Sequence, residues 1–84
     1  MEIILTNAGE AGMPEEMMGH CKTRIGQRIE RKFAGKVSAG DDVSVLYSEK
    51  DPLGTSGEVD DAAYLIYFTV DKVEGEKVYV NLEF

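Results

Sequence analysis

The sequence predicts an α+β fold, a two-layer sandwich in which one helix packs on a four-stranded mixed sheet, in the order β-α-β-β-β along the chain. One long segment, 14–34, repeats apolar residues at helical spacing, while four shorter segments are rich in β-branched and aromatic residues. Glycine, proline and asparagine gather between these segments, as they do in turns. A chain of 84 residues fits a single α+β domain spanning 1–84.

The first strand is predicted over residues 2–6, a short run of isoleucine, leucine and threonine after Glu2. Residues 7–12 contain an asparagine and two glycines, which indicate a loop. A glycine-containing loop before a helix has some likeness to a phosphate cradle. This one lacks the glycine spacing of those motifs and carries Glu10, which would repel phosphate, so we interpret it as a plain connection.

The helix is predicted over 14–34. Pro14 suits the first turn, where a missing N–H costs nothing, and Glu15 and Glu16 complement the positive end of the helix dipole. Gly35 is the predicted stop, because glycine readily adopts the left-handed conformation that follows many helices. The buried side is a stripe at three- and four-residue spacing: Met18, Cys21, Ile25, Ile29 and Phe33.

Gly19 and Gly26 lie seven residues apart beside this stripe. Each weakens a helix by roughly 1 kcal/mol relative to alanine, so their presence needs a reason. We interpret them as close packing of the helix against a strand backbone. Contact with a partner is the alternative.

Three further strands are predicted over 42–47, 62–71 and 77–84. A hairpin turn around Gly75 joins the last two, which are therefore antiparallel. The first strand, the helix and the second strand form a β-α-β unit, whose strands are expected to be parallel. Residues 48–61 are rich in turn-forming residues and are interpreted as a mobile loop.

One helix covers only one face of a sheet, and strand alternation decides which residues meet it. The helix-facing side is predicted to consist of Ile3, Leu5, Val43, Val45, Ile66, Phe68, Val70, Val78, Val80 and Leu82. On the opposite, uncovered face the same alternation places Ile4, Leu46, Leu65, Tyr67 and Tyr79. We hypothesise that this face is a homodimer or partner interface. A solvated face with scattered apolar residues is the alternative.

Few residues favour catalysis or metal binding. His20 is the single histidine, and Cys21 next to it points about 100° away on a helix. Nearby Lys22 and Arg24 could lower the pKa of the Cys21 thiol, but no third group to orient a nucleophile is evident. We expect no enzyme activity, metal or cofactor. The acids of the 48–61 loop do not match a calcium-binding motif and are interpreted as solvated: Glu49, Asp51, Glu58, Asp60 and Asp61.

Charge is distributed unevenly along the chain. Residues 21–37 carry six of the nine basic residues and one of the sixteen acids, in a chain of net charge −7. Arg24, Arg28 and Arg31 fall on one flank of the helix at i, i+4 and i+7. This flank is interpreted as solvated, as a protein contact or as a nucleic-acid contact. The overall negative charge disfavours the last of these.

The opening strand Met1–Thr6, the helix from Pro14 through Arg28-Ile-Glu-Arg-Lys-Phe33 and the valine-rich strand after it resemble the opening of ribosome hibernation-promoting factors. That resemblance implies a β-α-β-β-β-α fold and a basic helix in contact with ribosomal RNA. It covers at most the first 47 residues, and it carries over no functional residue.

The leading hypothesis is therefore a small acidic, cytoplasmic, non-enzymatic binding or regulatory protein that acts by protein–protein contact. One version is an inhibitor whose acidic surface imitates nucleic acid, like small acidic proteins of phages and mobile elements. The alternatives are an RNA- or ribosome-contacting module that uses the basic helix, and a small thiol-dependent enzyme. No apolar run is long enough to span a membrane, and Glu2 does not fit a signal peptide, so no membrane partner is expected.

Overall fold

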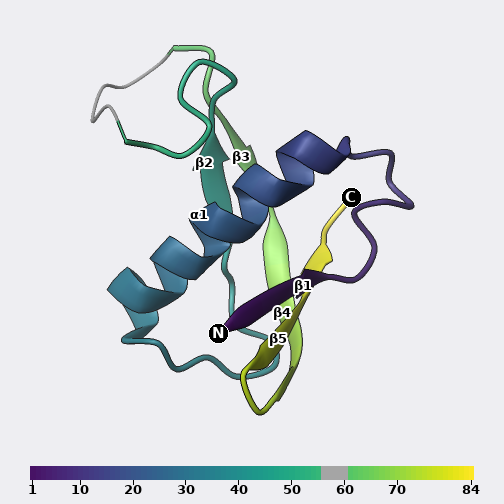
Figure 1. Cartoon of the computed structure of the whole chain (residues 1–84), viewed down its shortest axis with the longest axis vertical. Coiled ribbons are helices and arrows are strands. Elements are labelled where there is room, and N and C mark those ends of the chain that lie inside the picture. Colours follow the sequence, from purple (N-terminus) through teal and green to yellow (C-terminus); the bar gives the residue numbers. More distant parts are fainter. Residues whose placement is uncertain (56–60) are drawn as a thin grey trace.

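The computed structural model describes residues 1–55 and 61–84. Within them the chain forms β1 (Glu2–Leu5), α1 (Glu15–Phe33), β2 (Val45–Tyr47), β3 (Tyr64–Ile66), β4 (Phe68–Glu74) and β5 (Lys77–Leu82) (Figure 1). The α+β class is confirmed, and the order along the chain is close to the predicted one, with five strands in place of four. The sheet differs in detail, because the strands divide into a three-stranded sheet, β1-β5-β4, and a two-stranded sheet, β2-β3.

The three-stranded sheet is mixed. β4 and β5 are antiparallel and joined by a tight turn in which Gly75 has φ +59°, as the sequence predicted. β1 is parallel to β5, with Ile3 opposite Val78 and Leu5 opposite Val80. The expected parallel pairing of the first strand with the strand after the helix is wrong, since β2 pairs only with β3 among the described residues. β5 instead takes the central position.

The predicted strand 62–71 is interrupted at Tyr67, where β3 ends and β4 begins. The interruption coincides with Ser44, whose hydroxyl accepts the N–H of Phe68 at 3.0 Å in place of a backbone carbonyl. The Phe68 carbonyl in turn accepts the N–H of Val43 at 3.0 Å. Backbone bonds between residues 40–43 and β4 keep the two sheets joined along this edge.

Helix α1 begins one residue later than predicted and ends at Phe33. Pro14 precedes it in an extended conformation, and the Pro14 carbonyl accepts the N–H of Met18 at 2.9 Å. At the other end Ala34 already has φ +52° and Gly35 follows with φ +80°, so the left-handed conformation starts one residue before Gly35. The N–H of Gly35 reaches back to the Ile29 carbonyl at 3.1 Å, which closes the last turn.

The core lies between α1 and the two sheets, and α1 contacts β1 on one side and β2 on the other. Cys21, Ile25 and Ile29 supply the helix side of it. All ten strand-side residues that alternation predicted are buried in this core or partly buried against it, so that prediction is confirmed. Tyr47 is also buried, on the same side as Val43 and Val45.

The 7–12 loop is built as a connection. The Asn7 amide donates to the Leu82 carbonyl at 2.9 Å and accepts the Leu82 N–H at 2.7 Å, so this side chain continues the β1–β5 pairing beyond Leu5. The N–H groups of Ala11, Gly12 and Met13 donate to carbonyls within the same loop. The donors that a phosphate cradle would offer are therefore already in use.

Candidate binding surfaces

Three exposed apolar side chains come from the two-stranded sheet and the residue that follows it, and we call them the apolar strip: Leu46, Leu65 and Tyr67. Leu46 and Leu65 are directly opposite each other across β2 and β3. They are 48% and 52% exposed, and Tyr67, which follows β3, is 53% exposed. These three residues of the predicted interface are therefore open to solvent.

The other two residues predicted for this face, Ile4 and Tyr79, lie opposite each other on the three-stranded sheet and are only partly exposed. A bulge at Asp71 brings Lys72 opposite Tyr79, and the Lys72 ammonium lies 4.7 Å from the ring centroid. Lys72 thus covers part of the surface that was expected to be bare. The structure does not bring all five residues together.

A polar band separates the two groups. Thr69 pairs with Asn81 between them, and the Thr69 hydroxyl donates to Glu83. The Thr6 hydroxyl donates to the Asn81 side chain on the neighbouring edge. The outer face of the three-stranded sheet is therefore mainly polar, and the apolar strip is confined to the two-stranded sheet and Tyr67.

The three arginines of the basic flank line one cavity of about 190 Å³ between α1 and β2. We call it the arginine pocket: Arg24, Gln27, Arg28 and Arg31 from α1, Val45 and Leu46 from β2, and Gly54 from the following loop. The sequence predicted the arginine flank and Leu46 as separate candidates, and the fold brings them together. Val45, Gln27 and Gly54 were missed as members of this site, because only the placement of α1 against β2 reveals them.

The absence of a side chain at Gly54 leaves room for Arg24 in this pocket. Gly54 has φ +65°, and the Arg24 guanidinium lies so close that a Cβ at Gly54 would be 1.9 Å from its Nη1. Glycine is favoured there both by its conformation and by the space Arg24 needs. None of the three arginines forms an ion pair with a residue in the described ranges.

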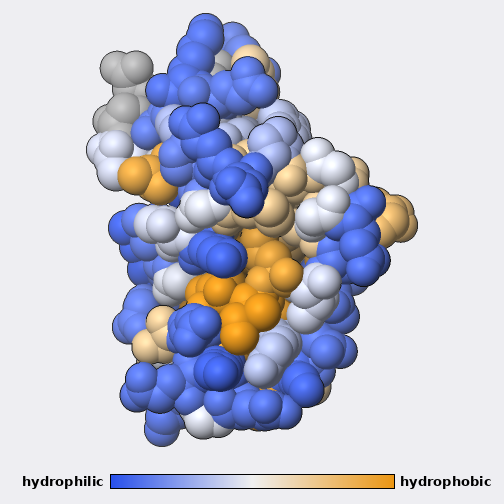
Figure 2. Space-filling model, turned by 45° about the vertical axis from the view of Figure 1, so that its right-hand side comes forward, coloured by the Kyte–Doolittle hydropathy of each residue, from blue (hydrophilic) through white to orange (hydrophobic). Residues whose placement is uncertain are grey.

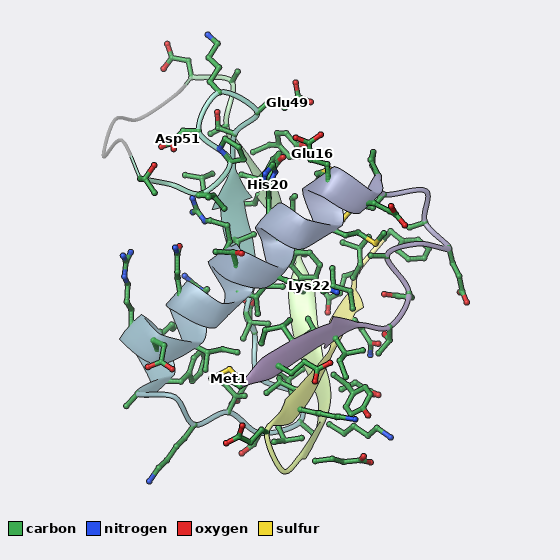
Figure 3. All side chains as sticks on the ribbon, viewed as in Figure 1. Met1, Glu16, His20, Lys22, Glu49 and Asp51 are labelled. Atoms are coloured by element: carbon green, nitrogen blue, oxygen red, sulfur yellow. The ribbon has the colours of Figure 1, made fainter. Side chains whose placement is uncertain are left out.

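His20 and Cys21 do not form a catalytic pair. His20 lies on the α1 surface near Glu16 and the loop after β2 (Figure 3), and its Nδ1 is 3.5 Å from the Tyr47 hydroxyl. The Cys21 side chain is buried in the core. Burial raises the pKa of the Cys21 thiol to about 11, against a smaller opposing effect of the Arg24 charge. The Arg24 charge does lower this pKa, as the sequence suggested it could, but burial has the larger effect and the net shift is upward.

No group of three or more histidine, cysteine or acidic side chains in residues 1–55 and 61–84 is placed to hold a metal ion. Of the loop acids considered for calcium, Glu58 and Asp60 lie outside the described residues, as does part of the predicted 48–61 loop. Glu49 and Asp51 lie in the part of the loop that follows β2 (Figure 3).

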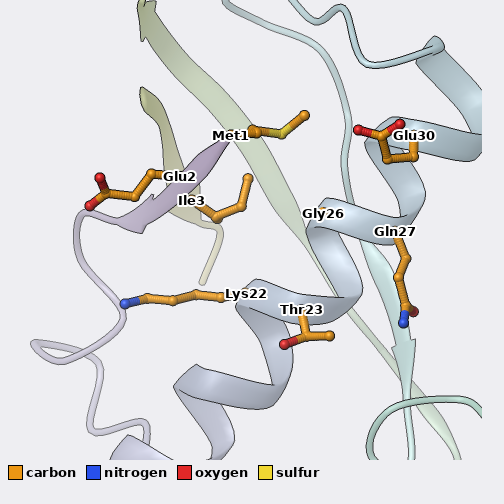
Figure 4. Close-up of a pocket in the computed structure, with 8 residues that line it drawn as sticks. All are labelled: Met1, Glu2, Ile3, Lys22, Thr23, Gly26, Gln27 and Glu30. Atoms are coloured by element: carbon orange, nitrogen blue, oxygen red, sulfur yellow. The ribbon is translucent and has the colours of Figure 1, made fainter. Parts of the chain in front are cut away.

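A second, larger groove separates α1 from β1. On the side of the molecule seen in Figure 2, hydrophobic side chains gather in a hollow bordered by hydrophilic ones. A cavity of about 570 Å³ lies between Met1 and Ile3 on one side and α1 on the other, and Figure 4 shows Glu2 pointing away from it. Lys22, Glu2 and Glu30 border it, so its charge is mixed.

The helix glycines open onto solvent or this groove. Gly26 lines the groove, and a Cβ at either Gly19 or Gly26 would meet no atom within 4 Å. Our interpretation that they allow close packing on a strand backbone is therefore wrong. Their position leaves space beside α1 instead.

No helix in the described part of the chain is both long and apolar enough to cross a membrane. Neither a protein-family model, nor a curated protein, nor a solved structure matches the chain, so its function is inferred from its own residues.

Proposed function

We propose that this protein is a non-enzymatic binding protein that acts by contact with another protein through the apolar strip. The observation that carries the proposal is the cross-strand pair Leu46–Leu65, about half exposed, with the equally exposed Tyr67 two residues after Leu65. Tyrosine is common at protein interfaces, because it offers a large apolar ring and a polar tip. Three side chains make a small contact, so the strip would form the centre of a wider one.

A different protein fits this surface better than a second copy of the chain. In a two-fold dimer the same patch meets itself. Because Leu46 belongs to both the strip and the arginine pocket, such a dimer would bring two arginine flanks to one interface. Like charges placed together in this way disfavour association.

The non-enzymatic part of the proposal is supported by the state of the thiol. A pKa of about 11 keeps Cys21 protonated at neutral pH, and its side chain is buried. A protonated, buried thiol is a poor nucleophile. One unpaired cysteine also suits a reducing compartment, which is why we retain a cytoplasmic location in the proposal.

The proposal is tested by comparing three forms of the protein as bait in lysate of the source cells. Leu65→Lys places a charge in the centre of the strip, whereas Val73→Lys makes the same change at an exposed site on β4. We expect quantitative mass spectrometry to show a partner retained by the wild type and by Val73→Lys, and lost with Leu65→Lys.

The same proteins are measured alone by light scattering. A monomeric wild type agrees with the proposal. If the wild type is a dimer and Leu65→Lys dissociates it, the partner of the apolar strip is a second copy of the chain and not a different protein. Identical capture by all three forms would remove the apolar strip as the contact surface.

A further inference from the structure

We propose that the arginine pocket binds carboxylates of an acidic segment of the partner protein, next to an apolar side chain that the same segment places on Leu46. This inference rests on the proposed function and names the chemistry of the partner. It follows from the charge, pairing and position of the pocket.

Three arginines from one flank of α1 line the pocket. A guanidinium presents several N–H donors in a planar fork that matches a carboxylate. Although the chain carries sixteen acids, no described carboxylate forms an ion pair with Arg24, Arg28 or Arg31. The pocket therefore offers cationic donors that the described part of the chain leaves unpaired.

Arg28 carries the clearest sign of a missing partner. Its Nε is buried and has no hydrogen-bond partner among the described residues. An unpaired buried donor costs free energy, and an acceptor supplied from outside would remove that cost. Within the chain, the Arg28 charge acts on Asp42. Hydrogen bonds from Ser44 lower the pKa of Asp42 first, and the charges of Arg28 and Lys32 lower it further without an ion pair.

The pocket is also partly apolar. Val45 and Leu46 line it together with the arginines, and Leu46 pairs with Leu65 on the apolar strip. The cationic pocket and the strip therefore meet at one residue. A segment that carries an acidic residue near an apolar one could contact both at once.

A protein segment fits this charge pattern better than a nucleic acid. Proteins that bind nucleic acids neutralise several phosphates along the backbone. Here all three arginines of the chain lie in the pocket, Lys22 borders the groove on the other side of α1, and Lys32 lies over the Phe33 ring at 5.7 Å. Phosphates beyond the pocket would approach a chain of net charge −7, whereas one or two carboxylates need only the pocket.

The experiment measures the fluorescence anisotropy of labelled probes with the full chain at low salt. The main probe is a peptide that alternates glutamate and leucine. The comparison probes are a glutamate–serine peptide, a lysine–leucine peptide and a single-stranded oligonucleotide of the same charge as the main probe. We expect the glutamate–leucine peptide to bind most tightly and the lysine–leucine peptide not to bind.

Variants assign this binding to the pocket. Arg28→Gln is expected to weaken binding of the glutamate–leucine peptide by about tenfold or more, because it removes a partly buried cation. Lys77→Gln removes the same charge from an exposed position on β5 and is expected to change affinity by about twofold at most. If Arg28→Gln fails to fold by circular dichroism, Arg31→Gln, at an exposed position, repeats the test.

Three results would overturn the inference: no binding of either glutamate peptide at about 1 mM, equal loss with Arg28→Gln and Lys77→Gln, or tighter binding of the oligonucleotide than of the peptides. Leu65→Lys separates this inference from the proposed function. If Leu65→Lys abolishes binding of the glutamate–leucine peptide and Arg28→Gln does not, the strip is supported as the contact and the pocket is not. If only Arg28→Gln weakens binding, and the glutamate–leucine and glutamate–serine peptides bind equally well, the pocket is supported as the contact and the strip is not.

Discussion

The side chains of Asn7 and Ser44 form hydrogen bonds with strand backbone that a neighbouring strand's backbone would otherwise form. The Asn7 amide both donates to and accepts from Leu82, so it acts as one more residue of the β1–β5 ladder. The Ser44 hydroxyl accepts the Phe68 N–H at the point where the predicted long strand divides. Neither role is visible in the sequence, where Asn7 suggests only a loop and Ser44 lies inside the strand predicted over 42–47.

Cys21 is the residue whose environment decides between a reactive and an inert thiol. It lies on the buried stripe of α1, and its pKa is raised from 9.0 to about 11. A raised pKa means that the thiol stays protonated up to a higher pH in the folded chain than in the unfolded chain. At pH 8 the folded chain would hold about a hundredfold less thiolate.

We therefore expect iodoacetamide to label Cys21 at least about a hundredfold more slowly in the native protein than in the protein unfolded in urea, both at pH 8. Mass spectrometry of quenched samples measures both rates, and the unfolded protein is the internal control. Native labelling as fast as unfolded labelling would contradict the buried position and would restore the thiol-dependent alternative.

Among the elements, α1 shows which predictions a periodic pattern supports. The apolar stripe predicted the buried side of the helix except at its start, where Met17 rather than Met18 packs against the core. The acidic first turn and the glycine stop placed the helix ends to within one residue. Ala34 could not have been identified as the left-handed residue, because alanine disfavours a positive φ and Gly35 follows it directly. The role predicted for Gly26 was wrong, because the spacing of residues in the sequence does not show what lies opposite a helix position.

The open position of Gly26 gives a prediction for α1. Gly26→Ala adds a methyl group that meets no atom within 4 Å, and alanine favours a helix over glycine by about 1 kcal/mol. We expect the melting temperature to rise by about 4–8 °C. Differential scanning calorimetry measures it.

The control is Gly75→Ala, which makes the same substitution at φ +59° in the β4–β5 turn. A positive φ disfavours alanine by about 1–2 kcal/mol, so this variant is expected to melt at a lower temperature. A fall in melting temperature for Gly26→Ala would show that the groove beside α1 is closed in solution.

The strands show where sequence reasoning stops. Alternation identified the strand residues that face the helix except Tyr47, because that pattern is local and one face is buried. Pairing is not local. The parallel partner of β1 is the last strand, and the division at Tyr67 depends on Ser44 from a distant segment. The bulge at Asp71, which places Lys72 over Tyr79, likewise arises from register with β5.

At the scale of the whole molecule, packing of the elements brings together the parts of the candidate site, which are separate in the sequence. The sequence indicated an arginine flank and an apolar face, but it gave no reason to join them. The packing of α1 against β2 places Leu46 at the border of both. A chain with a net charge of −7 thereby presents one confined cationic pocket.

The shared core also predicts how the molecule unfolds. Phe68 is fully buried, begins β4, and bonds through its backbone to Val43 and Ser44 on the way to β2. Because the two sheets share this core, we expect them to unfold together. Truncating a buried phenylalanine to alanine costs about 3–5 kcal/mol, a large part of the roughly 4–13 kcal/mol expected for a domain of this size.

Urea unfolding of the wild type and of Phe68→Ala tests this coupling. Tyrosine fluorescence reports mainly on the two-stranded sheet and its surroundings, since Tyr47, Tyr64 and Tyr67 lie there, while circular dichroism reports on α1. We expect the two signals to coincide in the wild type, as in a two-state transition, and both midpoints to fall in Phe68→Ala. Phe84→Ala is the matched control, because Phe84 is 89% exposed and its loss should leave both midpoints unchanged. Separate transitions for fluorescence and circular dichroism would mean that the two-stranded sheet is an independent unit, and that the arginine pocket between it and α1 opens before the protein unfolds.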